Sequence, residues 1–128
     1  EYLMDDIYRA EIIDHYKNPR NFGDLADADV VVRETNASCG DLIELAVKWG
    51  DGRVSKIKFK SVGCAISTAA ASLLTEKIKN EKLKMKNLRE LGEQDMMALL
   101  GIEVSPTRMK CALLPLRALQ KALRLRSG

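Results

Sequence analysis

Three cysteines and one aspartate are the residues of this 128-residue chain whose types and positions could do chemistry. Cys39, Cys64 and Cys111 are widely spaced, with no close CxxC pair of the kind that marks zinc ribbons, ferredoxins and thioredoxin-like proteins. Their number is odd and no secretory signal precedes them, so a disulfide framework would leave one thiol over. Metal ligation or thiol chemistry is therefore the better first interpretation.

Each cysteine is predicted to lie where an element ends. Cys39 falls in a loop between two strands, Cys64 at a strand-to-helix junction, and Cys111 in the first two turns of the last helix. A helix N-terminus carries unpaired N–H groups and a partial positive charge, which stabilise a thiolate. Gly40 and Gly63 are expected to leave room for a bulky inorganic cluster or for a partner's backbone. The alternative is that the cysteines are buried small hydrophobic residues.

Asp41 is the oxygen donor nearest to a cysteine along the chain. It stands two residues after Cys39, on the same side of an extended chain, and would complete a tetrahedral site of three thiolates and one carboxylate. Alternatively, it caps a turn, as most loop aspartates do. A hard carboxylate among soft thiolates is an exchangeable ligand for iron. Such a site suits assembly and release better than permanent electron transfer, which favours four thiolates.

Hydrophobic periodicity gives the elements that must position these residues. We expect helices over residues 5–17, 64–79, 87–91, 94–100 and 109–125, and strands over residues 30–35, 42–49 and 54–62. Ile7, Ile12 and Ile13 are placed on one face of the first helix, and Pro115 stands where it can bend the last one. The predicted fold class is α+β: a small antiparallel three-stranded sheet with helices packed on one face, forming a single domain over residues 1–128.

Composition narrows the function classes. The net charge of +3 is spread along the chain, so no nucleic-acid-binding stripe is predicted. No apolar run is long enough to span a membrane and no signal peptide is visible, which makes a cytoplasmic location the expectation. The last helix carries a group of cations: Arg117, Lys121, Arg124 and Arg126. We interpret them as a solvated helix face that also favours the helix C-terminus, or alternatively as a docking patch for an acidic partner.

Four segments resemble the signatures of the IscU/NifU/SufU family of iron–sulfur cluster scaffolds. They are residues 14–23 (DHYKNPRNFG), 37–41 (ASCGD), 62–67 (VGCAIS) and 110–112 (KCA), in the family's order and over nearly the whole chain. The resemblance implies the scaffold fold, and a cluster or zinc site on the three cysteines plus Asp41. It also implies a cysteine desulfurase as sulfur donor, with Cys111 as the persulfide acceptor.

The chain departs from this pattern near its last cysteine. Lys110 stands where IscU proteins have a histidine, and an ammonium group has no lone pair for a metal. Lysine there resembles the SufU branch, whose long insertion between the second and third cysteines this chain lacks. The Leu-Pro-Pro-Val-Lys segment that a dedicated Hsp70 chaperone recognises in IscU is replaced by residues 104–108 (VSPTR), so the resemblance does not imply cluster transfer by that chaperone.

Two residues receive separate interpretations. Lys110 is expected either to stay a solvated cation or, as a hypothesis, to act beside the site by pairing with Asp41 when no metal is bound. His15, the single histidine, is expected to cap or pack rather than to ligate a metal.

The leading expectation for function is a scaffold, not an enzyme, that builds a [2Fe-2S] cluster from Fe²⁺, persulfide sulfur and electrons and passes it to apoproteins. Its partners would be a cysteine desulfurase, an electron donor such as a ferredoxin, and apo iron–sulfur proteins, and it would hold the cluster as a monomer or a homodimer. The first alternative is a zinc-dependent sulfurtransferase of the SufU kind, with Zn²⁺ in the same site and Cys111 relaying persulfide. The second is a structural zinc module.

Overall fold

The fold comprises three strands and five helices in the part of the chain that the structure describes. This computed structural model describes the backbone of residues 4–36 and 40–126, and side chains from residue 9 onward within those ranges. Along the chain the elements are α1 (Met4–Lys17), β1 (Val30–Asn36), β2 (Asp41–Gly50), β3 (Arg53–Val62), α2 (Ala65–Glu81), α3 (Met85–Glu90), α4 (Glu93–Leu100) and α5 (Pro106–Arg126). The predicted order of elements and the α+β class are confirmed.

The sheet is antiparallel, with strand order β1-β2-β3. A tight turn joins β2 to β3, with Asp51 and Gly52 at φ values of 53° and 73°. Two consecutive positive φ angles are typical of the hairpin turn whose twist matches that of the flanking strands. The strands predicted over residues 42–49 and 54–62 therefore form a hairpin.

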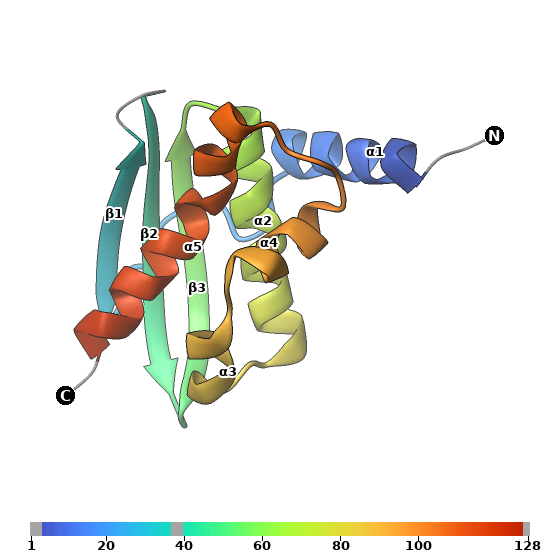
Figure 1. The fold of residues 1–128 in the computed structure, drawn as a ribbon. Coiled ribbons are helices and arrows are strands. Elements are labelled where there is room, and N and C mark those ends of the chain that lie inside the picture. Colours follow the sequence, from blue (N-terminus) through green and yellow to red (C-terminus); the bar gives the residue numbers. More distant parts are fainter. Residues whose placement is uncertain (1–3, 37–39, 127–128) are drawn as a thin grey trace.

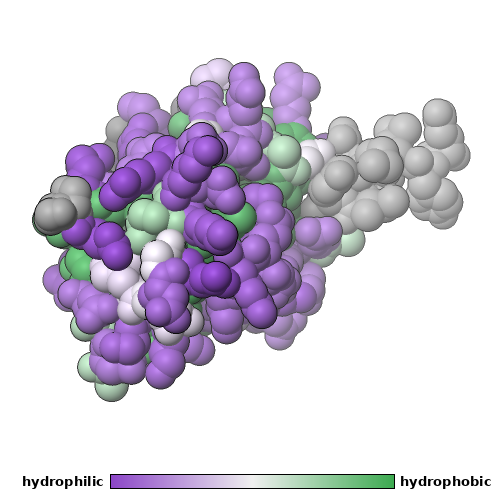
Figure 2. Space-filling model, turned by 90° about the horizontal axis from the view of Figure 1, so that it is seen from below, coloured by the Kyte–Doolittle hydropathy of each residue, from purple (hydrophilic) through white to green (hydrophobic). Residues whose placement is uncertain are grey.

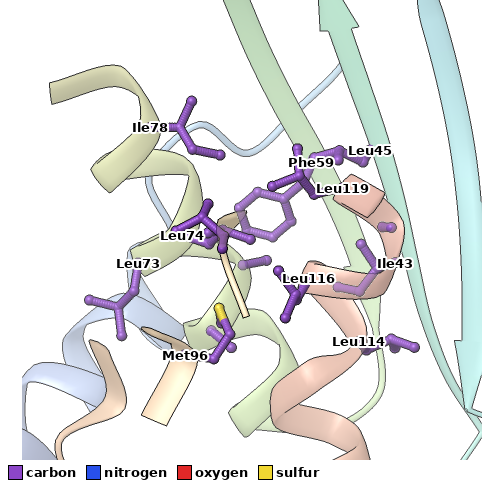
Figure 3. Packing of buried hydrophobic residues seen from close by; sticks show 14 of the residues in the cluster. Ile43, Leu45, Phe59, Leu73, Leu74, Ile78, Met96, Leu114, Leu116 and Leu119 are labelled. Carbon is purple, nitrogen blue, oxygen red and sulfur yellow. The ribbon is translucent and has the colours of Figure 1, made fainter. Parts of the chain in front are cut away.

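The larger helices lie on one face of the sheet, as Figure 1 shows. α5 packs on β1 and β2, α2 packs on β3, and α1 packs on α2. Between these layers lies the core seen in Figure 3, which includes Ile43, Leu45, Phe59, Leu74, Leu116 and Leu119. Burying one side chain of this size contributes about 1.5–3 kcal/mol to the free energy of folding. The core therefore holds the strand ends and helix starts in place. None of the described helices is long and apolar enough to cross a bilayer.

The buried face of α1 differs from the prediction. Ile12 is buried, but Ile13 is 53% exposed, and the side chain that joins Ile12 in the interior is His15, at 3% exposure. Positions three apart share a helix face, so the pair Ile12 and His15 obeys the helical period. The placement of Ile13 on that face was wrong because the polar His15 takes the buried position.

Two glycines mark the ends of α4. Gly101 has a φ of 68° and ends α4 in the left-handed conformation. Gly92 begins α4, and Asp95 accepts a hydrogen bond from its backbone N–H at 2.8 Å.

α5 begins at Pro106 and continues through the buried Pro115.

The strands β1 and β2 extend further than predicted at one end of the sheet. Asn36 and Asp41, expected in a loop, are strand residues directly opposite each other in the register. At this end, uppermost in Figure 1, the ends of β1 and β3 meet the starts of β2, α2 and α5. The opposite end, seen from below in Figure 2, is covered mainly by hydrophilic residues with scattered apolar areas. The β1–β2 connection, the β3–α2 junction and the start of α5, three stretches that are distant in sequence, thus converge at the upper end.

Candidate metal centre

Cys64 is the N-cap residue of α2. Its backbone is extended, at φ −66° and ψ 140°, and its Sγ accepts a hydrogen bond from Ile66 N at 3.4 Å. Ser67 Oγ donates to Cys64 O at 2.9 Å, which fixes the first turn. The thiol therefore lies at the positive end of a 17-residue helix, where negative charge on sulfur is stabilised. The predicted strand-to-helix position of Cys64 is confirmed.

Asp41 begins β2 and points into the molecule. Alternation along the strand puts it on the same face as Ile43 and Leu45, and it is only 2% exposed. Its Oδ1 accepts a hydrogen bond of 2.8 Å from Cys64 N. Its Oδ2 is buried and, in the described part of the chain, has no hydrogen-bond partner. A buried carboxylate oxygen without a partner is costly, and a bound cation would remove that cost.

Gly63 permits the contact between β2 and the start of α2. Its φ is 117°, and a Cβ built on it would lie 3.0 Å from Asp41 Cα and run into the Asp41 carboxylate. The space at Gly63 is therefore filled by Asp41, which corrects the expectation of room for a cluster or for a partner's backbone. Gly40 has a φ of 73° and nothing within 4 Å of its would-be Cβ.

Cys111 lies in the second turn of α5 and is 1% exposed. Asn36 Nδ2 donates to its Sγ at 3.8 Å. The ligand atoms of Asp41, Cys64 and Cys111 all lie within 4.8 Å of one another. They line a pocket of about 430 Å³ together with Gly63, Ala65, Thr107 and Arg108. Two sulfurs and an unpartnered carboxylate oxygen form a donor set suited to Zn²⁺ or iron.

Cys39, the remaining predicted ligand, lies outside the described residues. The described chain resumes at Gly40, whose N–H donates to Asn36 O at 2.9 Å, and continues directly into Asp41. The structure therefore brings three of the four predicted ligands together.

Arg108 was not predicted as a site residue. Its Nη1 donates to Cys64 Sγ at 3.4 Å, and it lines the pocket. It stands three residues before Cys111 on α5, a spacing that puts both on one helix face, and this spacing was the signal that could have revealed it. Lys110 is exposed and forms no ion pair with Asp41, both of which the structure describes. Of the two expectations for Lys110, the structure agrees with the solvated cation.

Asn36 is the second residue that the sequence did not reveal. It is a buried polar side chain at the end of β1, and its partner Cys111 is distant in sequence. No local pattern predicts a contact between a strand end and a helix so far along the chain.

His15 lies apart from this pocket, between α1 and α2. Its Nδ1 is 2.6 Å from Ser72 Oγ, and Ser72 Oγ also accepts a hydrogen bond from Arg20 N at 2.9 Å. Burial lowers the pKa of His15 below 6.5, and the charge of Arg20 lowers it further, against an opposing effect of Glu76. The histidine therefore packs as a neutral side chain that joins two helices, as expected.

The cations of the last helix are mostly on the surface. Arg117, Arg124 and Arg126 are exposed, Lys121 Nζ donates to Arg33 O at 3.0 Å, and the Arg126 guanidinium lies 5.5 Å from the centre of the Trp49 ring. Three of the four cations are thus exposed, as both the solvated face and the docking patch require.

Comparison with known proteins identifies the family. A family model described as the NifU-like N-terminal domain matches residues 7–125. The zinc-dependent sulfurtransferase SufU of Bacillus subtilis is 38% identical over 98% of this chain and 95% of its own length. The iron–sulfur cluster assembly scaffold protein IscU of Haemophilus influenzae is 35% identical over 91% of this chain and 92% of its own length.

A solved structure agrees with these sequence relatives. The crystal structure of a putative iron–sulfur cluster assembly scaffold protein for the SUF system from Fervidobacterium islandicum superposes with a TM-score of 0.70. It is 31% identical and covers 88% of this chain and 93% of that one. The chain thus belongs to the NifU-like N-terminal domain family, whose members above are named both as IscU scaffolds and as a SufU sulfurtransferase.

Proposed function

We propose that this protein is an iron–sulfur cluster assembly scaffold that builds a [2Fe-2S] cluster and passes it to apoproteins. The observation that carries the proposal is the buried Asp41 Oδ2, an exchangeable oxygen donor that lies beside Cys64 and Cys111 and has no hydrogen-bond partner in the described chain. Cys39 would supply the fourth ligand. Iron and persulfide sulfur are the substrates, a cysteine desulfurase supplies the sulfur, and a ferredoxin-like protein supplies electrons.

Sulfur would enter the site at Cys111. Its thiolate attacks the outer sulfur of the donor's persulfide; one S–S bond forms on Cys111 as the donor's S–S bond breaks, and the donor leaves as a thiolate. No net oxidation occurs in this exchange. Because Cys111 is 1% exposed although it lines the pocket, the start of α5 would have to move for the donor to reach its sulfur.

Asp41 would allow the bound cluster to leave the site. Its Oδ1 is held by Cys64 N while Oδ2 is available to iron, and a carboxylate exchanges more readily than a thiolate. Arg108 offers a positive charge beside Cys64 Sγ, which offsets the negative charge that several thiolates and a carboxylate accumulate around a metal.

A second candidate is a zinc-dependent sulfurtransferase, and one distance favours it. In a tetrahedral zinc site with Zn–S bonds of about 2.3 Å, neighbouring ligand atoms lie about 3.5–3.8 Å apart. A [2Fe-2S] cluster divides its ligands between two irons and spreads them further, so a mutual distance of at most 4.8 Å for three ligand atoms suits a single ion. Zinc would hold the thiolates ready for sulfur transfer, and the likeness to SufU points the same way.

Anaerobic purification followed by metal and sulfide analysis separates the two candidates. A brown protein with near-equal iron and acid-labile sulfide, able to activate an apo-ferredoxin, supports the scaffold. A colourless protein with one zinc that resists reconstitution, and that stimulates a desulfurase only with Cys111 intact, supports the sulfur relay. A protein that binds neither metal nor cluster overturns both.

A further inference from the structure

Asn36 connects three segments that carry site residues. It ends β1, directly opposite Asp41 of β2, and its backbone O accepts the hydrogen bond from Gly40 N at 2.9 Å. Its side chain reaches α5, where Nδ2 lies 3.8 Å from Cys111 Sγ. Asn36 therefore contacts the base of the segment that contains Cys39, the strand that carries Asp41, and the sulfur of Cys111.

Asn36 is buried, so its side-chain amide depends on the contact with Cys111 Sγ for a hydrogen-bond partner. Its side chain faces the helices and is 5% exposed, whereas the adjacent Thr35 faces outward and is exposed. A buried amide needs a hydrogen-bond partner, and for the Asn36 Nδ2 that partner is the sulfur of Cys111. An N–H group directed at sulfur stabilises the negatively charged form, which is the form that binds a metal.

The two described sulfurs thus have different donors. Cys64 Sγ, nearer the surface, accepts from the backbone N–H of Ile66 and from the side chain of Arg108, while the buried Cys111 Sγ accepts from the side chain of Asn36. A charged, exposed donor moves readily, but an amide at a strand end is held by the sheet.

We propose that Asn36 is a positioning residue that orients Cys111 Sγ toward the metal through its Nδ2–H group. The inference rests on the proposed use of the pocket as a metal-thiolate site. Hydrogen-bond partners behind a metal ligand typically change metal affinity by about 10–100-fold when removed. We expect Asn36→Leu, which keeps the branched shape of the side chain but has no donor, to weaken zinc binding by about 10-fold or more.

Cobalt-loaded protein gives a readout that packing alone would not move. Removing an N–H group from a ligand sulfur raises the energy of its lone pairs, so the sulfur-to-cobalt charge-transfer band should shift to longer wavelength in Asn36→Leu. Thr35→Val, on the same strand end but on the exposed face, is the matched control and should leave both the band and the zinc affinity unchanged. A band and affinity unchanged in Asn36→Leu would overturn the inference.

A second measurement covers the case in which Asn36→Leu does not fold. In NMR spectra of the metal-free protein, the Asn36 side-chain amide signals should move more in Cys111→Ser than in Cys64→Ser. Equal or absent changes contradict the proposed contact. Failure of wild-type protein to bind zinc, cobalt or a reconstituted cluster would instead count against the proposed function, so the two failures are distinguishable.

Discussion

The carboxylate of Asp41 occupies the space in which a side chain at Gly63 would lie. Gly63 has a φ of 117°, and Asp41 Oδ1 accepts a hydrogen bond from the next backbone N–H, that of Cys64. The glycine therefore lets one strand end and one helix start approach closely enough to bring a carboxylate beside a thiol.

Replacing Gly63 should damage both folding and the metal site. In Gly63→Ala the new Cβ meets Asp41 while the backbone remains in a conformation that only glycine adopts readily, so we expect a loss of about 2–4 kcal/mol in unfolding free energy. Zinc affinity should also fall, because Asp41 must move. Denaturant unfolding and zinc titration with a competing chelator measure the two effects.

Gly52→Ala provides the control for Gly63→Ala. Gly52 also has a positive φ, of 73°, but nothing lies within 4 Å of its would-be Cβ, and it is in the β2–β3 turn. We expect a cost of about 1–2 kcal/mol from the backbone alone and an unchanged zinc affinity. Equal zinc affinities for the two variants would contradict the role assigned to Gly63.

Asp41→Asn should separate stability from metal binding. The variant keeps an acceptor for Cys64 N but loses the carboxylate charge, so the unfolding free energy of the metal-free protein should stay within about 1 kcal/mol of wild type. Zinc affinity should fall by about 10-fold or more, because an amide is a weaker ligand than a carboxylate. Asp24→Asn, at an exposed residue that pairs with Lys60, is the control and should retain full affinity.

Arg108 and Lys110 should differ although both are cations near Cys111. Three thiolates and one carboxylate around a divalent metal carry a net negative charge, so a cation held at Cys64 Sγ stabilises the loaded state. We expect Arg108→Gln to speed zinc loss to a chelator several-fold. Lys110→Gln should change that rate less than about two-fold, because Lys110, which is exposed as Arg108 is, has no contact with Cys64 Sγ in the described chain and solvent screens its charge. Equal effects of the two substitutions on the rate of zinc loss would show that this rate depends on overall charge rather than on the contact between Arg108 and sulfur.

The neutral state of His15 makes stability depend on pH. Its pKa in the folded protein is lowered from 6.5, so below pH 6.5 the unfolded chain binds more protons than the folded one and stability falls. The stabilising contribution is complete above pH 6.5 and is lost as the pH drops through the folded pKa. Urea unfolding at pH 7.5, 6.5 and 5.5 should show this decline in wild type. His15→Asn keeps a polar atom toward Ser72 without titrating there, so its decline should be smaller.

Local pattern accounts for most of the fold and for part of the site. Alternating Ile43, Leu45 and Val47 predict a strand with one buried face, and the same period of two puts Asp41 on that face. The change of pattern after Gly63 predicts that a helix begins near Cys64. Such features follow from periods and caps a few residues long.

The features of the site that the sequence did not predict depend on contacts between distant segments. Asn36 and Arg108 act on sulfurs 75 and 44 residues away, and no local period encodes those distances. The space at Gly63 was assigned to a ligand rather than to Asp41 for the same reason. Ile13 was placed inside because hydrophobicity alone cannot foresee that Ser72 and Arg20 N form a polar niche for His15.

We propose above all that Asp41, Cys64 and Cys111 act with Cys39 as one metal site. X-ray absorption spectroscopy on the zinc-loaded protein is the most direct test of this proposal. We expect three sulfur ligands and one oxygen ligand at the metal of the wild-type protein. The oxygen contribution should change in Asp41→Ala, and one sulfur ligand should be lost in each of Cys39→Ala, Cys64→Ala and Cys111→Ala. An imidazole signature from His15, or a coordination shell unchanged in Cys64→Ala and Cys111→Ala, would contradict it.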